Sequence, residues 1–195
     1  SSDKNSPELY AKVMHYFILF CALLMVAISV NLSWIGPIFL QGSGYEAAFS
    51  IVPILLMGYL LLGIYFNLSI WFKITDHTKY SFWITLLGAV VSILVIVGLV
   101  PSLGYLGAAL SSLACYLVMS LTCYVLGQRY FPIPYQTGKD IFYLLIAFGL
   151  SYLGFYIEFD EAIWSFLAKN LLVAMFLGMI IILEKKQLNQ LRKRI

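Results

Sequence analysis

The sequence predicts an all-α integral membrane protein with about six transmembrane helices. Its composition, its long apolar runs and the placement of its basic residues all support this class. Of the 195 residues, 62% are hydrophobic and 11% are charged, and the mean hydropathy is +0.93. Soluble domains contain about 45–50% apolar and about 25% charged residues. A chain of this length has room for six spans of about 20 residues, which leaves none for a separate soluble domain.

Six apolar runs give the predicted spans, and short connections join them. We expect Pro101 to end the third span, because proline lacks a backbone N–H and its ring disfavours a continuing helix. Pro53 should bend the second span. The segment SWIGPIFLQGSGYE is expected to be a connection. The spans cover approximately residues 13–32, 47–72, 80–100, 106–126, 141–157 and 162–183.

Basic residues predict the orientation, because cytoplasmic loops of membrane proteins are enriched in lysine and arginine. All but one of the 12 basic residues precede the first span, follow the last, or lie in the second or fourth connection. The other three connections contain none, so both ends of this segment should be cytoplasmic. The chain begins without an initiator Met or a signal peptide, and we expect it to be a piece of a longer protein. The eleven residues are Lys4, Lys12, Lys73, Lys79, Arg129, Lys139, Lys185, Lys186, Arg192, Lys193 and Arg194.

Few residues could support catalysis, and we expect no enzyme activity. His15 and His77 are the only histidines, and each is expected to be a solvated side chain at the cytoplasmic boundary. The three cysteines lie in apolar runs without a CxxC pair, which argues against a metal site or a disulfide framework. No cofactor, metal or nucleic-acid partner is expected.

Two helix faces carry small or polar residues. In the fourth span, Gly104, Ala108, Ser111 and Cys115 recur at helical spacing and predict a face for close helix packing. In the second span, Tyr59, Gly63 and Asn67 form a polar stripe in the membrane. Such a stripe suits either the lining of a water-filled cavity or hydrogen bonds to a neighbouring helix.

The last span contains Lys169, the only charge expected inside the membrane. It lies about two helical turns from the outer end, so we expect its stem to snorkel toward that interface, with Asn170 as a possible partner. A functional role is the alternative. The closing EKKQLNQLRKRI either lies on an anionic membrane surface or is a frayed, solvated tail.

The third and fourth spans carry a family pattern. A basic loop is followed by an apolar helix with a Pro-x-x-Gly turn, and Gly-x-x-Gly-Ala-Ala opens the next helix. This layout resembles the multidrug/oligosaccharidyl-lipid/polysaccharide exporter superfamily. Together with YFNLSIWFKITDHTKY and VLGQRYFPIPY, it is similar to lipid-linked oligosaccharide flippases of Bacteroidetes-type bacteria. The turn and opening residues are Pro101, Gly104, Gly107, Ala108 and Ala109.

The resemblance implies a fold of two six-helix lobes around a central cavity, often followed by two extra helices. Residues 1–130 would be the last four helices of the second lobe, and residues 131–195 the extra pair with a basic tail. The preceding helices of the same protein are then missing partners. The implied activity is the flipping of a polyprenyl-diphosphate-linked sugar by alternating access, and the implied location is the inner membrane of a bacterium, with membrane lipid around the protein. Lys73, Lys79 and Arg129 could attract the diphosphate at the cytoplasmic entrance, although orientation alone also requires basic residues there.

Two other functions stay open. A drug or cation exporter of the same superfamily should place an acidic residue inside the membrane for ion coupling, and no Asp or Glu lies deep in a predicted span. A membrane glycosyltransferase or polymerase acting on lipid-linked sugars should have a large outer loop with Arg, His or Glu, whereas the outer loops here are short and lack basic residues.

Overall fold

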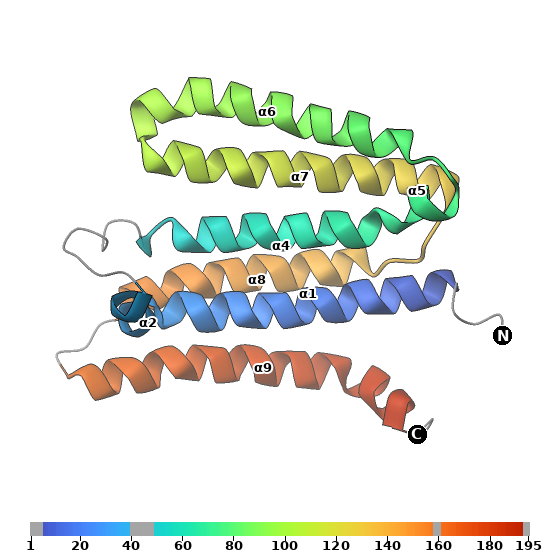
Figure 1. Cartoon of the computed structure of the whole chain (residues 1–195). Coiled ribbons are helices and arrows are strands. Elements are labelled where there is room, and N and C mark those ends of the chain that lie inside the picture. Colours follow the sequence, from blue (N-terminus) through green and yellow to red (C-terminus); the bar gives the residue numbers. More distant parts are fainter. Residues whose placement is uncertain (1–5, 40–48, 158–160, 193–195) are drawn as a thin grey trace.

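The computed structural model describes residues 6–39, 49–157 and 161–192, and its regular structure in these ranges is α-helical (Figure 1). Six helices there are long and apolar enough to cross a membrane, which confirms the predicted fold class. Helices α4 and α5 together form one of these six, Val52–Ile74. The helices are α1 (Pro7–Val30), α2 (Leu32–Phe39), α4 (Val52–Leu68), α5 (Ile70–Ile74), α6 (Lys79–Leu103), α7 (Tyr105–Tyr130), α8 (Thr137–Tyr156) and α9 (Ala162–Arg192).

The long helices lie roughly parallel or antiparallel in one bundle. In Figure 1, α6 and α7 form a hairpin at one edge, α4 lies next to α7, α1 and α8 follow, and α9 is at the other edge. Helix α1 and the α4–α5 span are the most enclosed, with half of their apolar window buried, against 11% for α6. Helix α1 begins and α9 ends at the same end of the bundle, in agreement with the expected even number of spans (Figure 1). We call this the basic end, since it carries Lys12, Lys73, Lys79, Arg129, Lys139 and Lys185.

The core forms along α4, which packs against α7 on one side and α1 on the other. Ala22 and Val26 of α1 are fully buried, and small residues of this kind let neighbouring helices approach closely. The Ser120 hydroxyl of α7 donates a hydrogen bond of 2.7 Å to the Leu61 carbonyl of α4. The buried Ser120 hydroxyl therefore finds its partner across helices, in a medium that supplies no water.

The α6–α7 hairpin packs through small and hydroxyl side chains. The Ser92 and Ser111 hydroxyls lie 2.8 Å apart, and Ser111 is buried between the helices. Gly107 lies against the α6 backbone, since a Cβ there would be 2.8 Å from backbone atoms of Leu99 and Val100. The predicted packing face of α7 is therefore correct at Ser111, whereas Gly104 and Ala108 are exposed.

The structure corrects three expectations about where helices end and bend. Helix α6 continues past Pro101 to Leu103, and it ends at Gly104, whose φ of 55° favours glycine. Pro53 lies in the first turn of α4, where the missing N–H has no intrahelical partner, so it begins the helix and does not bend it. Much of the segment expected to be the first connection is helix α2, and the following QGSGYE lies outside the described residues.

Substituting Gly107 tests the closeness of the α6–α7 contact. We expect Gly107→Ala to lower the free energy of unfolding by about 1–3 kcal/mol, because the new Cβ meets backbone atoms that cannot move aside. The matched control is Gly98→Ala on α6, where a Cβ meets nothing within 4 Å. It should stabilise the helix by up to about 1 kcal/mol. Unfolding in mixed micelles measures both, and equal stability of the two variants would contradict the close packing.

Candidate functional site

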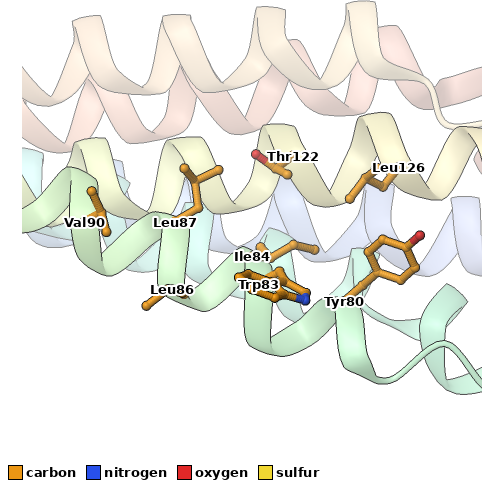
Figure 2. A pocket seen from close by; sticks show the side chains of 8 residues that line it. All are labelled: Tyr80, Trp83, Ile84, Leu86, Leu87, Val90, Thr122 and Leu126. Carbon is orange, nitrogen blue, oxygen red and sulfur yellow. The ribbon is translucent and has the colours of Figure 1, made fainter.

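An apolar groove of about 450 Å³ lies between α6 and α7 toward the basic end (Figure 2). Trp83 and Leu87 are 62% and 42% exposed, so the groove opens on the surface of the bundle. Two hydroxyl-bearing residues, Tyr80 and Thr122, are the polar members of an otherwise apolar lining. The groove suits a hydrocarbon chain better than a polar solute. Its lining comprises Tyr80, Trp83, Ile84, Leu86, Leu87, Val90, Thr122 and Leu126.

An aromatic cluster connects this groove to the basic end. The Tyr80 and Tyr130 hydroxyls are 2.5 Å apart and join α6 to α7. The Tyr130 ring stacks on Trp71 of α5 with centroids 5.3 Å apart, and Trp71 is almost completely buried. The His77 ring lies 5.0 Å from that of Tyr130. We call the end of the groove at these four rings, which belong to Tyr80, Tyr130, Trp71 and His77, the groove mouth. The rings pack this end of the groove against α5.

The three basic residues predicted to attract a diphosphate are next to this cluster in the sequence. Lys79 and Arg129 directly precede the paired tyrosines, and Lys73 lies in the last turn of α5. All three are exposed. The groove mouth therefore combines packed aromatic rings with exposed cations, which can bind an anionic group by charge-assisted hydrogen bonds.

The three residues of the polar stripe on α4, Tyr59, Gly63 and Asn67, contact different partners. Tyr59 is 61% exposed, and its ring lies 6.1 Å from that of Tyr116. The Asn67 side chain donates to the Gly63 carbonyl one turn earlier, at 3.0 Å. Gly63 packs against Phe17 of α1. Neither Tyr59 nor Asn67 lies among the groove residues.

Lys169 lies on the packed face of α9, with only 5% of its surface exposed. Leu172 and Phe176 continue this face, so the Lys169 stem lies against the bundle, and its snorkelling toward the outer interface stays a prediction. Asn170, expected as a partner of Lys169, instead pairs with Asn31 at the end of α1. Each of these two amides donates to the other's carbonyl oxygen, at 3.2 and 3.1 Å. The basic tail is helical as far as Arg192, which excludes the frayed alternative over the described residues.

Sequence reasoning missed a buried charged cluster at the basic end. His15 of α1 is 1% exposed, and its Nδ1 lies 2.5 Å from Oδ1 of Asp140 in the first turn of α8. Its Nε2 faces Oε2 of Glu184 in α9 at 3.5 Å. The Glu184 Oε1 accepts hydrogen bonds from Tyr143 at 3.0 Å and from Lys139 at 3.3 Å. The expectation that His15 is solvated is therefore wrong.

The predicted span limits explain the omission. The fifth span was expected to begin at residue 141 and the sixth to end at 183, so Asp140 and Glu184 were counted as loop residues. A signal was available in α8, where Asp140, Ala147, Ser151 and Gly154 are buried on one face at helical spacing. A carboxylate that continues a small-residue face is positioned to enter the bundle.

Within the described ranges, no group of three or more His, Cys, Asp or Glu side chains is arranged to hold a metal ion.

Burial raises the pKa of the Tyr135 phenol, in the connection before α8, so this group stays neutral at physiological pH. His77, outside the cluster of His15, has its Nδ1 2.6 Å from the Thr75 carbonyl.

Together, the six apolar helices define a multi-pass α-helical membrane protein. No protein-family model, curated protein or solved structure matches the chain. The function therefore has to be argued from the groove, its mouth and the buried polar contacts.

A double-mutant cycle tests the amide pair. We expect Asn31→Ala and Asn170→Ala to be coupled by about 0.6 kcal/mol, and by no more than about 1.7 kcal/mol, because interhelical hydrogen bonds in membranes are modest. Pairing Asn31→Ala with Asn67→Ala is the control, since Asn67 bonds within its own helix. Unfolding in mixed micelles gives the coupling energies, and no coupling between Asn31 and Asn170 would remove this contact from the account.

Proposed function

We propose that this chain is part of a transporter that flips a polyprenyl-diphosphate-linked oligosaccharide across the cytoplasmic membrane by alternating access. The observation that carries the proposal is the groove between α6 and α7, which leads to the basic, aromatic mouth at Lys79 and Arg129. This juxtaposition matches the chemistry of the substrate, a long hydrocarbon chain joined to a diphosphate. A groove for a polar solute would instead place hydrogen-bonding groups along its length.

The physical problem of flipping explains the separation of apolar and basic parts. A charged diphosphate and its sugars cannot cross about 30 Å of hydrocarbon without replacement of their hydration. The prenyl chain has no such cost and stays in the lipid or in an apolar groove beside it. Lys79 and Arg129 then hold the diphosphate near the basic end while the head group enters a polar cavity.

In this proposal the basic end faces the cytoplasm, and residues 1–130 are the last four helices of a second transport lobe. Further helices of the same protein supply the other lobe. Tyr59, on an exposed part of α4, would then face the cavity between the lobes. Helices α8 and α9 are the appended pair, and α8 packs along α1. The activity is transport and no chemical conversion.

A specific observation favours a second candidate, an ion-coupled drug or cation exporter of the same superfamily. The sequence argument against it was the lack of acidic residues inside the spans. Asp140 and Glu184 are 5% and 1% exposed within the bundle, so buried carboxylates are in fact present. Their contacts with His15 and Lys139 leave no obvious site for a bulky organic cation, which keeps flipping as the first choice.

Lipid binding by the chain itself tests the proposal. We expect a C55 polyprenyl diphosphate to bind in native mass spectrometry, and the combined Lys79→Gln and Arg129→Gln variant to bind about tenfold more weakly, because two charge-assisted contacts are lost. Lys12→Gln, at the same end on α1, is the charge control. Binding of the uncharged C55 polyprenol measures the contribution of the tail alone. Binding of phosphatidylglycerol measures the contribution of a common anionic head group. Equal binding of the diphosphate and phosphatidylglycerol would contradict a dedicated site.

A groove-filling substitution separates the tail contact from charge. Leu87→Trp occupies the groove, whereas Val97→Trp adds the same side chain at an exposed α6 position that is not among its lining residues. We expect only Leu87→Trp to weaken binding of the C55 diphosphate. In vesicles that contain the full-length transporter, the same variant should slow the appearance of the lipid-linked sugar in the opposite leaflet. Selective loss of organic-cation export with sugar flipping unchanged would favour the second candidate.

A further inference from the structure

The proposed function assigns no role to the cluster of His15, Asp140 and Glu184. In this cluster the hydrogen-bonding state of the His15 ring has to be explained. Both ring nitrogens of His15 face carboxylate oxygens, at 2.5 Å to Asp140 and 3.5 Å to Glu184. A neutral imidazole has one N–H donor and one lone pair. In that state one nitrogen would direct its lone pair at a carboxylate. The geometry therefore fits a ring that carries a proton on both nitrogens.

Burial makes this extra proton important for the whole cluster. His15 Nε2 and Glu184 Oε2 are completely buried, and neither makes a hydrogen bond within the described residues, although the two atoms face each other at 3.5 Å. An unpaired charge or lone pair in such a place is costly, because no water replaces the missing partner. Two carboxylates and the Lys139 ammonium are also present, so the set is electrically neutral when it holds one further proton, and the contacts of both ring nitrogens place that proton on His15.

The surroundings supply no substitute for that proton. The charged groups that act on His15 are Asp140 and Glu184, and those that act on Glu184 are His15 and Lys139. Tyr143 already donates to Glu184, and the Tyr16 ring lies 5.9 Å from that of His15. These groups come from α1, α8 and α9, the three helices that meet here.

We infer that His15, Asp140 and Glu184 form a binding site for one exchangeable proton, and that this proton fastens the basic end of α9 to α1 and α8. On release, the Nε2–H bond breaks, its electron pair stays on Nε2, and the proton passes to water at the basic end. The Lys139 side chain, which is 49% exposed, forms the boundary between the cluster and that water. Glu184 then faces a lone pair and keeps only Lys139 and Tyr143. The inference does not depend on the flipping proposal.

Nitrogen NMR of the histidine rings reads this proton directly. The chain has two histidines, so ¹⁵N-histidine labelling in lipid nanodiscs gives two sets of ring signals, and His77→Gln assigns them. At pH 7 we expect both nitrogens of His15 to be protonated in the wild-type chain. A single protonated nitrogen in wild type would overturn the inference without any further variant.

Glu184→Gln tests the role of the second carboxylate. It removes the negative charge that balances the additional proton, so we expect His15 to have only one protonated nitrogen at pH 7. The control is Glu8→Gln, an exposed carboxylate in the first turn of α1, which should leave both protons in place. Loss of the proton in both variants, or in neither, would contradict the assignment of the proton to this cluster.

Limited proteolysis tests the link to α9. Trypsin cleavage after the exposed Lys185 requires the end of α9 to leave the bundle. At a fixed pH we expect Glu184→Gln to be cleaved there about tenfold faster than wild type, and Glu8→Gln at the wild-type rate. Equal rates for Glu184→Gln and wild type would show that the proton does not hold the helix.

Discussion

The cost of burying charge away from water governs how the last two helices join the bundle. Lipid and protein interior both lack the water that would solvate His15, Asp140 and Glu184, so each has to find its partner in another helix. In an apolar medium, hydrocarbon contact alone discriminates weakly between helix arrangements, because lipid tails are as apolar as leucine. The charged cluster therefore specifies which helices meet and in what register. Its partners come from α1, α8 and α9.

A second polar contact fixes the other end of the same interface. The Asn31–Asn170 pair joins the end of α1 to α9 near the opposite end of the bundle. Between these two contacts the packing uses apolar residues such as Leu172 and Phe176. Two polar anchors at separate heights restrict sliding and tilting of α9, which an apolar face alone would permit. The α6–α7 hairpin is held differently, by small residues and hydroxyls such as Gly107 and Ser111, and most of α6 stays exposed.

The sequence predicted the number of spans and the common side of both termini, because apolar runs and basic loops reflect the thickness and polarity of the membrane. It also predicted that the face around Ser111 packs against a helix. Exact helix limits were less predictable. Pro101 is tolerated within the last turn of α6, and the limits placed just inside Asp140 and Glu184 hid the charged cluster. Contacts between residues 125 positions apart, such as His15 and Asp140, depend on tertiary packing that no local pattern specifies.

Polar contacts at both ends of the bundle hold α9 on α1. The most direct measurement is the distance distribution between spin labels at the exposed Phe20 of α1 and Leu177 of α9, in nanodiscs, with the three native cysteines replaced by alanine. We expect one narrow distribution, which broadens toward longer distances when His15→Gln and Asn31→Ala are combined. A distribution that is broad before these substitutions, or unchanged after them, would contradict the claim.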